Sequence, residues 1–95
     1  MLNGKQKRYL RALGNTRKAL FQIGKDGISL NLIDTLNDSL RVHELVKISV
    51  LKTCDIDIKE LSFDIAMSTK SEVVQIIGKT FLIYKASKEK RIELP

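Results

Sequence analysis

The fold is decided by residues 19–40, which read ALFQIGKDGISLNLIDTLNDSL. The first five residues are mostly apolar and predict a β-strand, which Gly24-Lys25-Asp26-Gly27 follows as a Gly-x-x-Gly turn. Ser29 is a favourable residue for capping a helix. Apolar residues then recur at helical spacing, at Leu32, Ile33, Leu36 and Leu40. A strand that passes through a glycine turn into a helix is a building unit of layered α/β folds.

The sequence before this stretch predicts one more helix. Asn3 can cap that helix, and Gln6, three residues later, completes a capping-box pattern. Gly14 stands where glycine commonly follows the end of a helix. We expect residues 17–23 to form the first strand, which would run directly into the glycine turn.

The sequence after the stretch predicts a second strand and a third helix. Residues 42–51 alternate between apolar and polar side chains, which is typical of a strand with one buried face. Asp57 and Glu60 form a helix-capping pattern and place negative charge at the positive end of the third helix. That helix would bury a stripe that consists of Ile58, Leu61 and Ile65.

A hairpin completes the predicted elements. Residues 73–77 and 80–85 predict two strands, which Gly78-Lys79 joins in a tight turn. The element order is therefore α-β-α-β-α-β-β. Alternating helices and strands imply crossovers and parallel pairing, whereas the final hairpin is antiparallel. We predict an α/β fold, a single layered domain over residues 1–95 with helices packed on a four-stranded mixed sheet.

Charge is distributed unevenly along the chain. Residues 1–18 contain six basic residues and no acidic one, residues 19–77 six basic and nine acidic, and residues 78–95 five basic and two acidic. The three net charges are therefore +6, −3 and +3. Two basic ends that meet on one face would bind a polyanion such as nucleic acid, and salt would weaken that binding. The alternative is that scattered lysines only keep a small protein soluble.

Enzymes, membrane proteins and metal sites are not expected. The only cysteine, Cys54, cannot form an internal disulfide or a thiolate metal cage, which suits a reducing cytoplasm. No stretch approaches the roughly 18 apolar residues of a membrane span. No nucleophile–base pair, metal-ligand set or Walker-type loop is visible, so we expect no catalytic residues, no metal, no cofactor and no small-molecule substrate.

Four segments of the chain match a known pattern in order and separation. They read KQKRYLR (residues 5–11), IGKDGIS (23–29), HELVKI (43–48) and VQIIGKTFLIY (74–84). Together they resemble the CRM-domain family, in particular its single-domain bacterial members of the YhbY type. The matching segments extend over nearly the whole chain, which makes the resemblance far more specific than a single Gly-x-x-Gly motif.

The resemblance implies a stand-alone RNA-binding module that associates with ribosomal RNA in precursor large ribosomal subunits. It also implies a fold like that of the C-terminal domain of bacterial translation initiation factor three, and it likens residues 24–27 to the RNA-clamping loop of KH domains. Two positions depart from the family pattern. Asp26 stands where the family often has an uncharged residue, and Tyr84-Lys85-Ala86 replaces Tyr-Arg-Pro.

Candidate RNA-binding residues lie in the glycine turn and in the basic segments. Backbone amides of the turn and Lys25 would hold phosphate, whereas the carboxylate of Asp26 would oppose it. A plain strand-to-helix turn is the alternative for these glycines, and a solvated helix surface is the alternative for the cations. The predicted set is Gly24, Lys25, Asp26, Gly27, Lys5, Lys7, Arg8, Arg11, Lys79 and Lys85.

Some residues in the middle of the chain do not suit an RNA-binding surface. An acidic cluster around the third helix would keep that side off a polyanion, and it consists of Asp55, Asp57, Glu60 and Asp64. Phe63 lies off the inward stripe of the same helix. Tyr84 could stack on a base or pack on the sheet.

The alternative function is a protein-interaction module whose basic ends contact an acidic protein or another copy of the chain.

Overall fold

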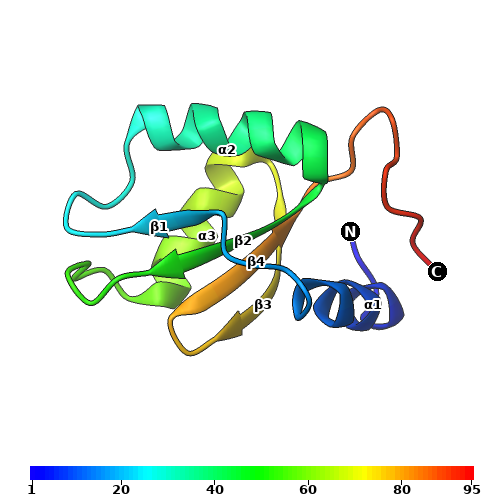
Figure 1. Cartoon of the computed structure of the whole chain (residues 1–95), viewed down its shortest axis with the longest axis horizontal. Coiled ribbons are helices and arrows are strands. Elements are labelled where there is room, and N and C mark those ends of the chain that lie inside the picture. Colours follow the sequence, from blue (N-terminus) through cyan, green and yellow to red (C-terminus); the bar gives the residue numbers. More distant parts are fainter.

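The computed structural model describes residues 1–95 and contains three helices and four strands, in the order α1-β1-α2-β2-α3-β3-β4. Helices α2 and α3 cover one face of the sheet, and α1 packs on the other face (Figure 1). The predicted α/β class, element order and four-stranded mixed sheet are confirmed. Both chain termini lie at the same end of the molecule as α1 (Figure 1).

Helix α1 spans Gly4–Gly14 and begins with the predicted cap. Asn3 Oδ1 accepts the Gln6 backbone N–H at 2.8 Å, and the Asn3 N–H donates to Gln6 Oε1 at 3.1 Å. The predicted role of Gly14 is wrong, because Gly14 is still helical and Asn15 is the capping residue. Gly14 serves packing instead: a Cβ there would lie 2.5 Å from Leu82 Cδ1, so only a residue without a side chain lets α1 pack this closely on the sheet.

Strand β1 spans Phe21–Ile23 and is shorter than predicted. The Arg17 N–H donates to the Gly14 O at 3.0 Å, so Arg17 still belongs to the turn that follows α1. Leu20 makes one backbone hydrogen bond to β2, in which its N–H donates to the Lys47 O at 3.0 Å. The chain therefore approaches the sheet over residues 17–20 and pairs with it only in the last three residues before the glycine turn.

Helix α2 spans Leu30–His43, and strand β2 spans Leu45–Val50. The predicted cap is confirmed, since Ser29 Oγ accepts the Leu32 N–H at 3.0 Å. The predicted start of the second strand is wrong, because residues 42 and 43 form the end of α2. Glu44 then adopts a positive φ of 63°, which lets the chain leave the helix and enter β2 at once.

Helix α3 spans Ile58–Thr69, and the hairpin consists of β3, Glu72–Ile77, and β4, Thr80–Tyr84. Asp57 occupies the N-cap position of α3, but its side chain makes no capping hydrogen bond. Gly78 adopts a φ of 56° in the predicted tight turn. None of the three helices has both the length and the apolar composition that a membrane span requires.

The strand order of the sheet is β1-β2-β4-β3. Strand β1 is parallel to β2, and the other two pairs are antiparallel. Ile23 pairs with Val50, and Ser49 pairs with Thr80. The glycine turn after β1, the connection after β2 and the β3–β4 turn therefore leave the sheet at one end, which we call the glycine end.

The sheet separates two hydrophobic cores. The larger core lies between the sheet and α2 and α3, and it contains buried residues that include Leu36, Leu40, Ile48, Ile65 and Phe81. Cys54 is buried in this core, as expected for a structural thiol. The smaller core lies under α1 and consists of Leu10, Leu45, Val74, Leu82 and Tyr84. The layers thus fix α1 on one side of the sheet and α3 on the other.

Candidate nucleic-acid interface

The glycine turn, residues 24–27, connects the end of β1 to the start of α2. The Gly27 N–H donates to the Gly24 O at 3.0 Å, which closes the turn, and Gly27 has a φ of 64°. A side chain is disfavoured at this φ, so backbone conformation alone requires the second glycine. A plain strand-to-helix turn, the alternative stated in the sequence analysis, is therefore enough to explain a glycine at position 27 without any ligand.

The glycine turn also rests closely on the β2–α3 connection, residues 51–57. A Cβ on Gly24 would lie 3.2 Å from Thr53 Oγ1, and one on Gly27 would lie 3.3 Å from Ile56 Cδ1. These contacts hold one side of the turn against the protein. The other side faces solvent, where Lys25 and Asp26 are both exposed.

An open groove of about 400 Å³ lies beside the glycine turn, between β1 and the first turns of α2. Its polar lining includes Gln22, Lys25, Asn31 and Thr35. No hydrogen bond of the chain uses the backbone N–H of Asn31 or of its neighbour Leu30, so both amides are available at the positive end of α2. Asp26 makes no ion pair and no side-chain hydrogen bond, and its charge therefore opposes an anion in this groove.

Lys79 lies at the glycine end as well. The Val50 N–H donates to the Lys79 O at 2.7 Å, and the Leu51 N–H donates to the Ile23 O at 2.8 Å. Strand β2 thus ends between the β3–β4 turn and the glycine turn. The exposed side chain of Lys79 and the glycine turn flank the end of the same strand.

The predicted cations of α1 lie toward the opposite end of the molecule (Figure 1). Lys5 and Arg8 are exposed, and Arg11 is half-buried. Lys7 forms an ion pair with Glu72, with 3.8 Å between Nζ and Oε2. Helix α1 contains no acidic residue, so every charged side chain on its outer surface is basic.

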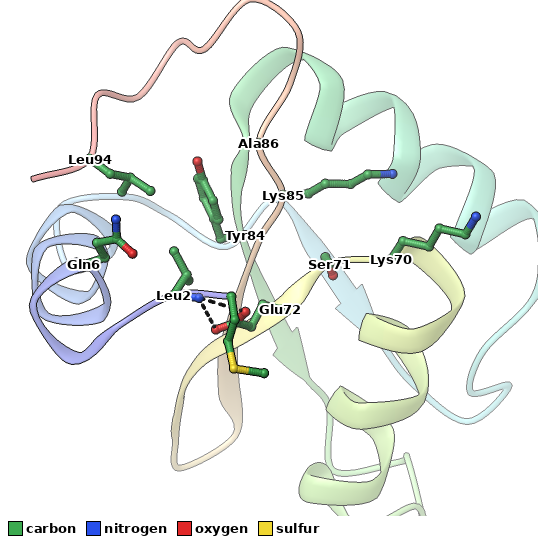
Figure 2. Close-up of a pocket in the computed structure, with 10 residues that line it drawn as sticks. Leu2, Gln6, Lys70, Ser71, Glu72, Tyr84, Lys85, Ala86 and Leu94 are labelled. Carbon is green, nitrogen blue, oxygen red and sulfur yellow. Dashed lines mark hydrogen bonds between the residues drawn. The ribbon is translucent and has the colours of Figure 1, made fainter.

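Lys85 follows β4 and also lies far from the glycine end. Its N–H donates to the Glu44 O at 2.9 Å. Figure 2 shows Lys85 at an open groove of about 410 Å³, with its side chain directed out of the groove in the same direction as that of Lys70. The Leu2 N–H reaches the Glu72 carboxylate at 3.2 Å in the same groove. The predicted set is therefore split: the glycine turn and Lys79 lie at one end, and the α1 cations and Lys85 at the other.

Sequence reasoning missed the residues that lie between these two groups. A small groove of about 220 Å³ is lined by three cationic side chains, the imidazole of His43 and no carboxylate, and the cations are Arg17, Lys18 and Lys47. Arg17 Nη1 donates to the Leu45 O at 2.9 Å, and Lys47 Nζ donates to the Arg17 O at 3.2 Å, so both cations are held in place. We call this the cationic groove.

The cationic groove follows from tertiary structure. Arg17 and Lys18 belong to the acid-free segment 1–18, which was a signal in the sequence. Lys47 lies on the polar side of β2, and His43 ends α2. No spacing rule places these two residues beside the segment that follows α1, because the contact depends on β1 pairing with β2.

Glu44 and Tyr84 are both buried at the end of the sheet opposite the glycine turn. Glu44 Oε2 accepts the Ser87 N–H at 2.5 Å, and Oε1 accepts the Ile92 N–H at 2.6 Å. Burial acts to raise the pKa of Glu44, but hydrogen bonds from Ser87, Ile92 and Arg91 outweigh it and lower the pKa below its model-compound value of 4.5. Burial, with a further contribution from the Glu44 charge, raises the pKa of Tyr84. Tyr84 packs on the sheet and is not available for base stacking.

Comparison with known proteins places this arrangement among proteins of similar sequence and fold. The family model described as the CRS1 / YhbY (CRM) domain matches residues 2–85. The probable RNA-binding protein YqeI of Bacillus subtilis is 43% identical over 96 residues, which cover 100% of both chains. An RNA-binding protein of Haemophilus influenzae is 32% identical over 99% of this chain and 95% of its own length. The solution structure of a hypothetical protein from Staphylococcus aureus has a TM-score of 0.82 and 47% identity, with both chains fully covered.

Proposed function

The chain belongs to the CRS1/YhbY (CRM) domain family, and on that premise we propose that it is an RNA-binding protein without catalytic activity. The relatives from Bacillus subtilis and Haemophilus influenzae are named as RNA-binding proteins and align over nearly their whole length. We further propose that residues 1–95 act as one RNA-binding domain.

The cationic groove is the observation that carries this proposal. It lies where the chain passes from α1 to β1, between the α1 cations and the glycine turn (Figure 1). RNA binding depends largely on phosphate contacts with basic side chains, and a surface without carboxylates suits such contacts. The groove turns two separate basic regions into one path that an RNA backbone can follow.

We assign roles along this path from the geometry. At the glycine end, the N–H groups of Leu30 and Asn31 have no partner at the start of α2, and Asn31 and Lys25 line the same groove. A free helix N-terminus beside a lysine is an arrangement that can hold a phosphate. The cationic groove would hold the continuing backbone. The exposed cations of α1, with Lys79 and Lys85 at the margins, would widen the surface without reading sequence.

The finer proposal is that the RNA is ribosomal RNA in precursor large ribosomal subunits. It rests on the four CRM-type segments of the sequence, which resemble those of bacterial YhbY-type proteins. A protein that binds precursor ribosomal subunits would act in the cytoplasm. The alternative, a protein-interaction module that contacts an acidic protein through its basic ends, predicts a complex that survives ribonuclease.

The test is filter binding of a large-subunit precursor RNA fragment across a salt series. The double variant Gly24→Asp, Lys25→Glu should lose at least about tenfold in affinity, because it adds two negative charges and removes one positive charge where phosphate would lie. Its matched control is Lys59→Glu, Ser68→Asp, which makes the same charge change at exposed positions of α3. Lys25→Glu alone, against Lys59→Glu, keeps the test valid because it does not disturb the close packing of Gly24.

Equal affinity of the glycine-turn variants and their controls would exclude the proposed site. Affinity that does not fall with salt would exclude the cationic path as a whole. An unrelated structured RNA of the same length tests the finer proposal: the precursor fragment should bind more tightly at the same salt concentration, and equal binding would leave ribosomal specificity unsupported.

A further inference from the structure

The outer face of α3 exposes two large apolar side chains side by side. Phe63 is 61% exposed and Met67 is 66% exposed, and they are one helical turn apart. The hydrophobic core does not need them, because α3 already buries Leu61, Ile65 and Ala66 on its inner side. Single exposed apolar residues are common on protein surfaces, whereas adjacent large ones often mark an interaction site.

The charge around this pair is opposite to that of the rest of the protein. Helices α2 and α3 together contain four acidic and two basic residues, whereas α1 contains four basic residues and no acidic one. Glu60 and Asp64 are exposed beside Phe63 on α3 and neither forms an ion pair, and Lys59 is the one cation of this helix. We call Glu60, Phe63, Asp64 and Met67 the α3 patch.

The α3 patch is unsuited to RNA. Its carboxylates would repel phosphate, and it lies across the sheet from α1 (Figure 1). It has, however, the composition of a protein-binding surface: an aromatic residue and a methionine at the centre, with charged groups around them. Its charge is complementary to a partner with basic residues around an apolar anchor.

We propose that the α3 patch binds a basic protein, which packs an apolar side chain against Phe63 and Met67 and places lysine or arginine beside Glu60 and Asp64. The partner would lie on the outer face of α3, whereas the RNA would follow α1, the cationic groove and the glycine turn, so one molecule can hold both. This inference does not depend on the RNA proposal, since it uses none of the residues assigned to RNA.

Photocrosslinking in cells tests the proposal. The photoreactive residue p-benzoylphenylalanine at position 63 replaces one exposed aromatic residue by another, and the same residue at Tyr9 on α1 is the matched control, since Tyr9 is also exposed. After ribonuclease treatment, position 63 should yield a discrete crosslink whose partner has a strongly basic sequence, and Tyr9 should not. The charge reversal Glu60→Lys, Asp64→Lys should lower the yield at position 63 at least fivefold.

Other results would overturn the proposal. A crosslink to a second copy of the chain would assign the patch to self-association, and a crosslink to RNA or to an acidic protein would contradict the charge argument. A yield unaffected by charge reversal, or no protein crosslink, would also exclude it. The variant Phe63→Ser, Met67→Ser, assayed by filter binding, should retain wild-type RNA affinity, so failure of the RNA proposal and failure of this one are separable.

Discussion

Asp26, in the turn before α2, is exposed and has no partner, whereas Glu44, in the turn after α2, is fully buried and accepts backbone hydrogen bonds from Ser87 and Ile92. The first turn closes with a single internal bond and leaves helix amides free. The second turn, through one carboxylate, binds the backbone of Ser87 and Ile92 in the segment after β4. The two acidic residues, one near each end of the same helix, therefore have different roles: Glu44 stabilises the fold, and Asp26 does not.

The difference separates a binding turn from a structural one. At the glycine turn, stability depends on the positive φ of Gly27 and on the close packing of Gly24, so Lys25 and Asp26 can change with little effect on folding. At Glu44, the side chain is part of the core, and the chain that it holds returns to pack Ile92 and Leu94 beside α1. We therefore expect substitutions at Glu44 to affect stability and substitutions at Asp26 to affect RNA affinity.

Glu44→Gln should have the largest effect. The amide side chain can accept only one of the two backbone N–H groups, so the other is buried without a partner, and we expect a loss of about 2–4 kcal/mol in the free energy of unfolding. Urea denaturation measures this loss. Glu93→Gln, at an exposed position of the same tail, is the control and should change stability by less than about 0.5 kcal/mol. Equal effects would show that Glu44 does not hold the tail.

Acid should remove the contribution of Glu44. Its pKa is lowered in the folded protein, so its stabilisation is complete above the unfolded value of 4.5 and is lost as the pH falls through the folded pKa. The difference in unfolding free energy between the wild type and Glu44→Gln should therefore narrow as the pH is lowered from 7 toward 3. A difference that stays constant over this range would mean that the carboxylate is not preferentially ionised in the fold.

Gly27→Ala should have a smaller effect on stability. The φ of 64° costs an alanine about 1–2 kcal/mol, and its Cβ would lie 3.3 Å from Ile56 Cδ1. Thermal denaturation measures the loss. Gly4→Ala is the matched control, because a Cβ there meets nothing within 4 Å and the first turn of α1 accepts alanine. No destabilisation by Gly27→Ala would show that the turn can adopt another conformation.

Asp26→Asn should have the smallest effect, and the effect should be on RNA alone. Removing an exposed charge that opposes phosphate should tighten binding about twofold to fivefold in low salt. Asp64→Asn makes the same charge change on α3, away from the proposed RNA path, and should leave affinity almost unaltered. Weaker binding by Asp26→Asn would mean that this carboxylate shapes the turn.

Local signals in the sequence were sufficient for the fold. The caps at Asn3 and Ser29, the apolar spacing in α2 and the Gly78 turn each depend on residues within a few positions, and the structure confirms them. The end of α2 was misplaced because the alternation of residues 42–51 continues into the helix. The positive φ of Glu44 gives no signal in a sequence, since glutamate is not among the residues that favour this conformation.

The candidate site was less predictable because it depends on distant contacts. The glycine turn could be found from its motif, but the sequence could not show that α1 and Lys85 lie far from it. The cationic groove is formed by residues from three regions: the segment that follows α1, the end of α2, and strand β2. Only the pairing of β1 with β2 brings these regions together. The role of Gly14 likewise depends on Leu82, nearly seventy residues away.

The central claim is that RNA occupies the path from α1 through the cationic groove to the glycine turn, and leaves α3 free. Titration of the 15N-labelled protein with a precursor ribosomal RNA fragment, followed by amide chemical shifts, tests it most directly. We predict that the largest changes occur at residues 17–18, 24–31 and 47 and on the exposed side of α1, with the amides of Phe63 and Met67 unchanged. Changes concentrated on α3, with the glycine turn and the cationic groove unaffected, would contradict the account.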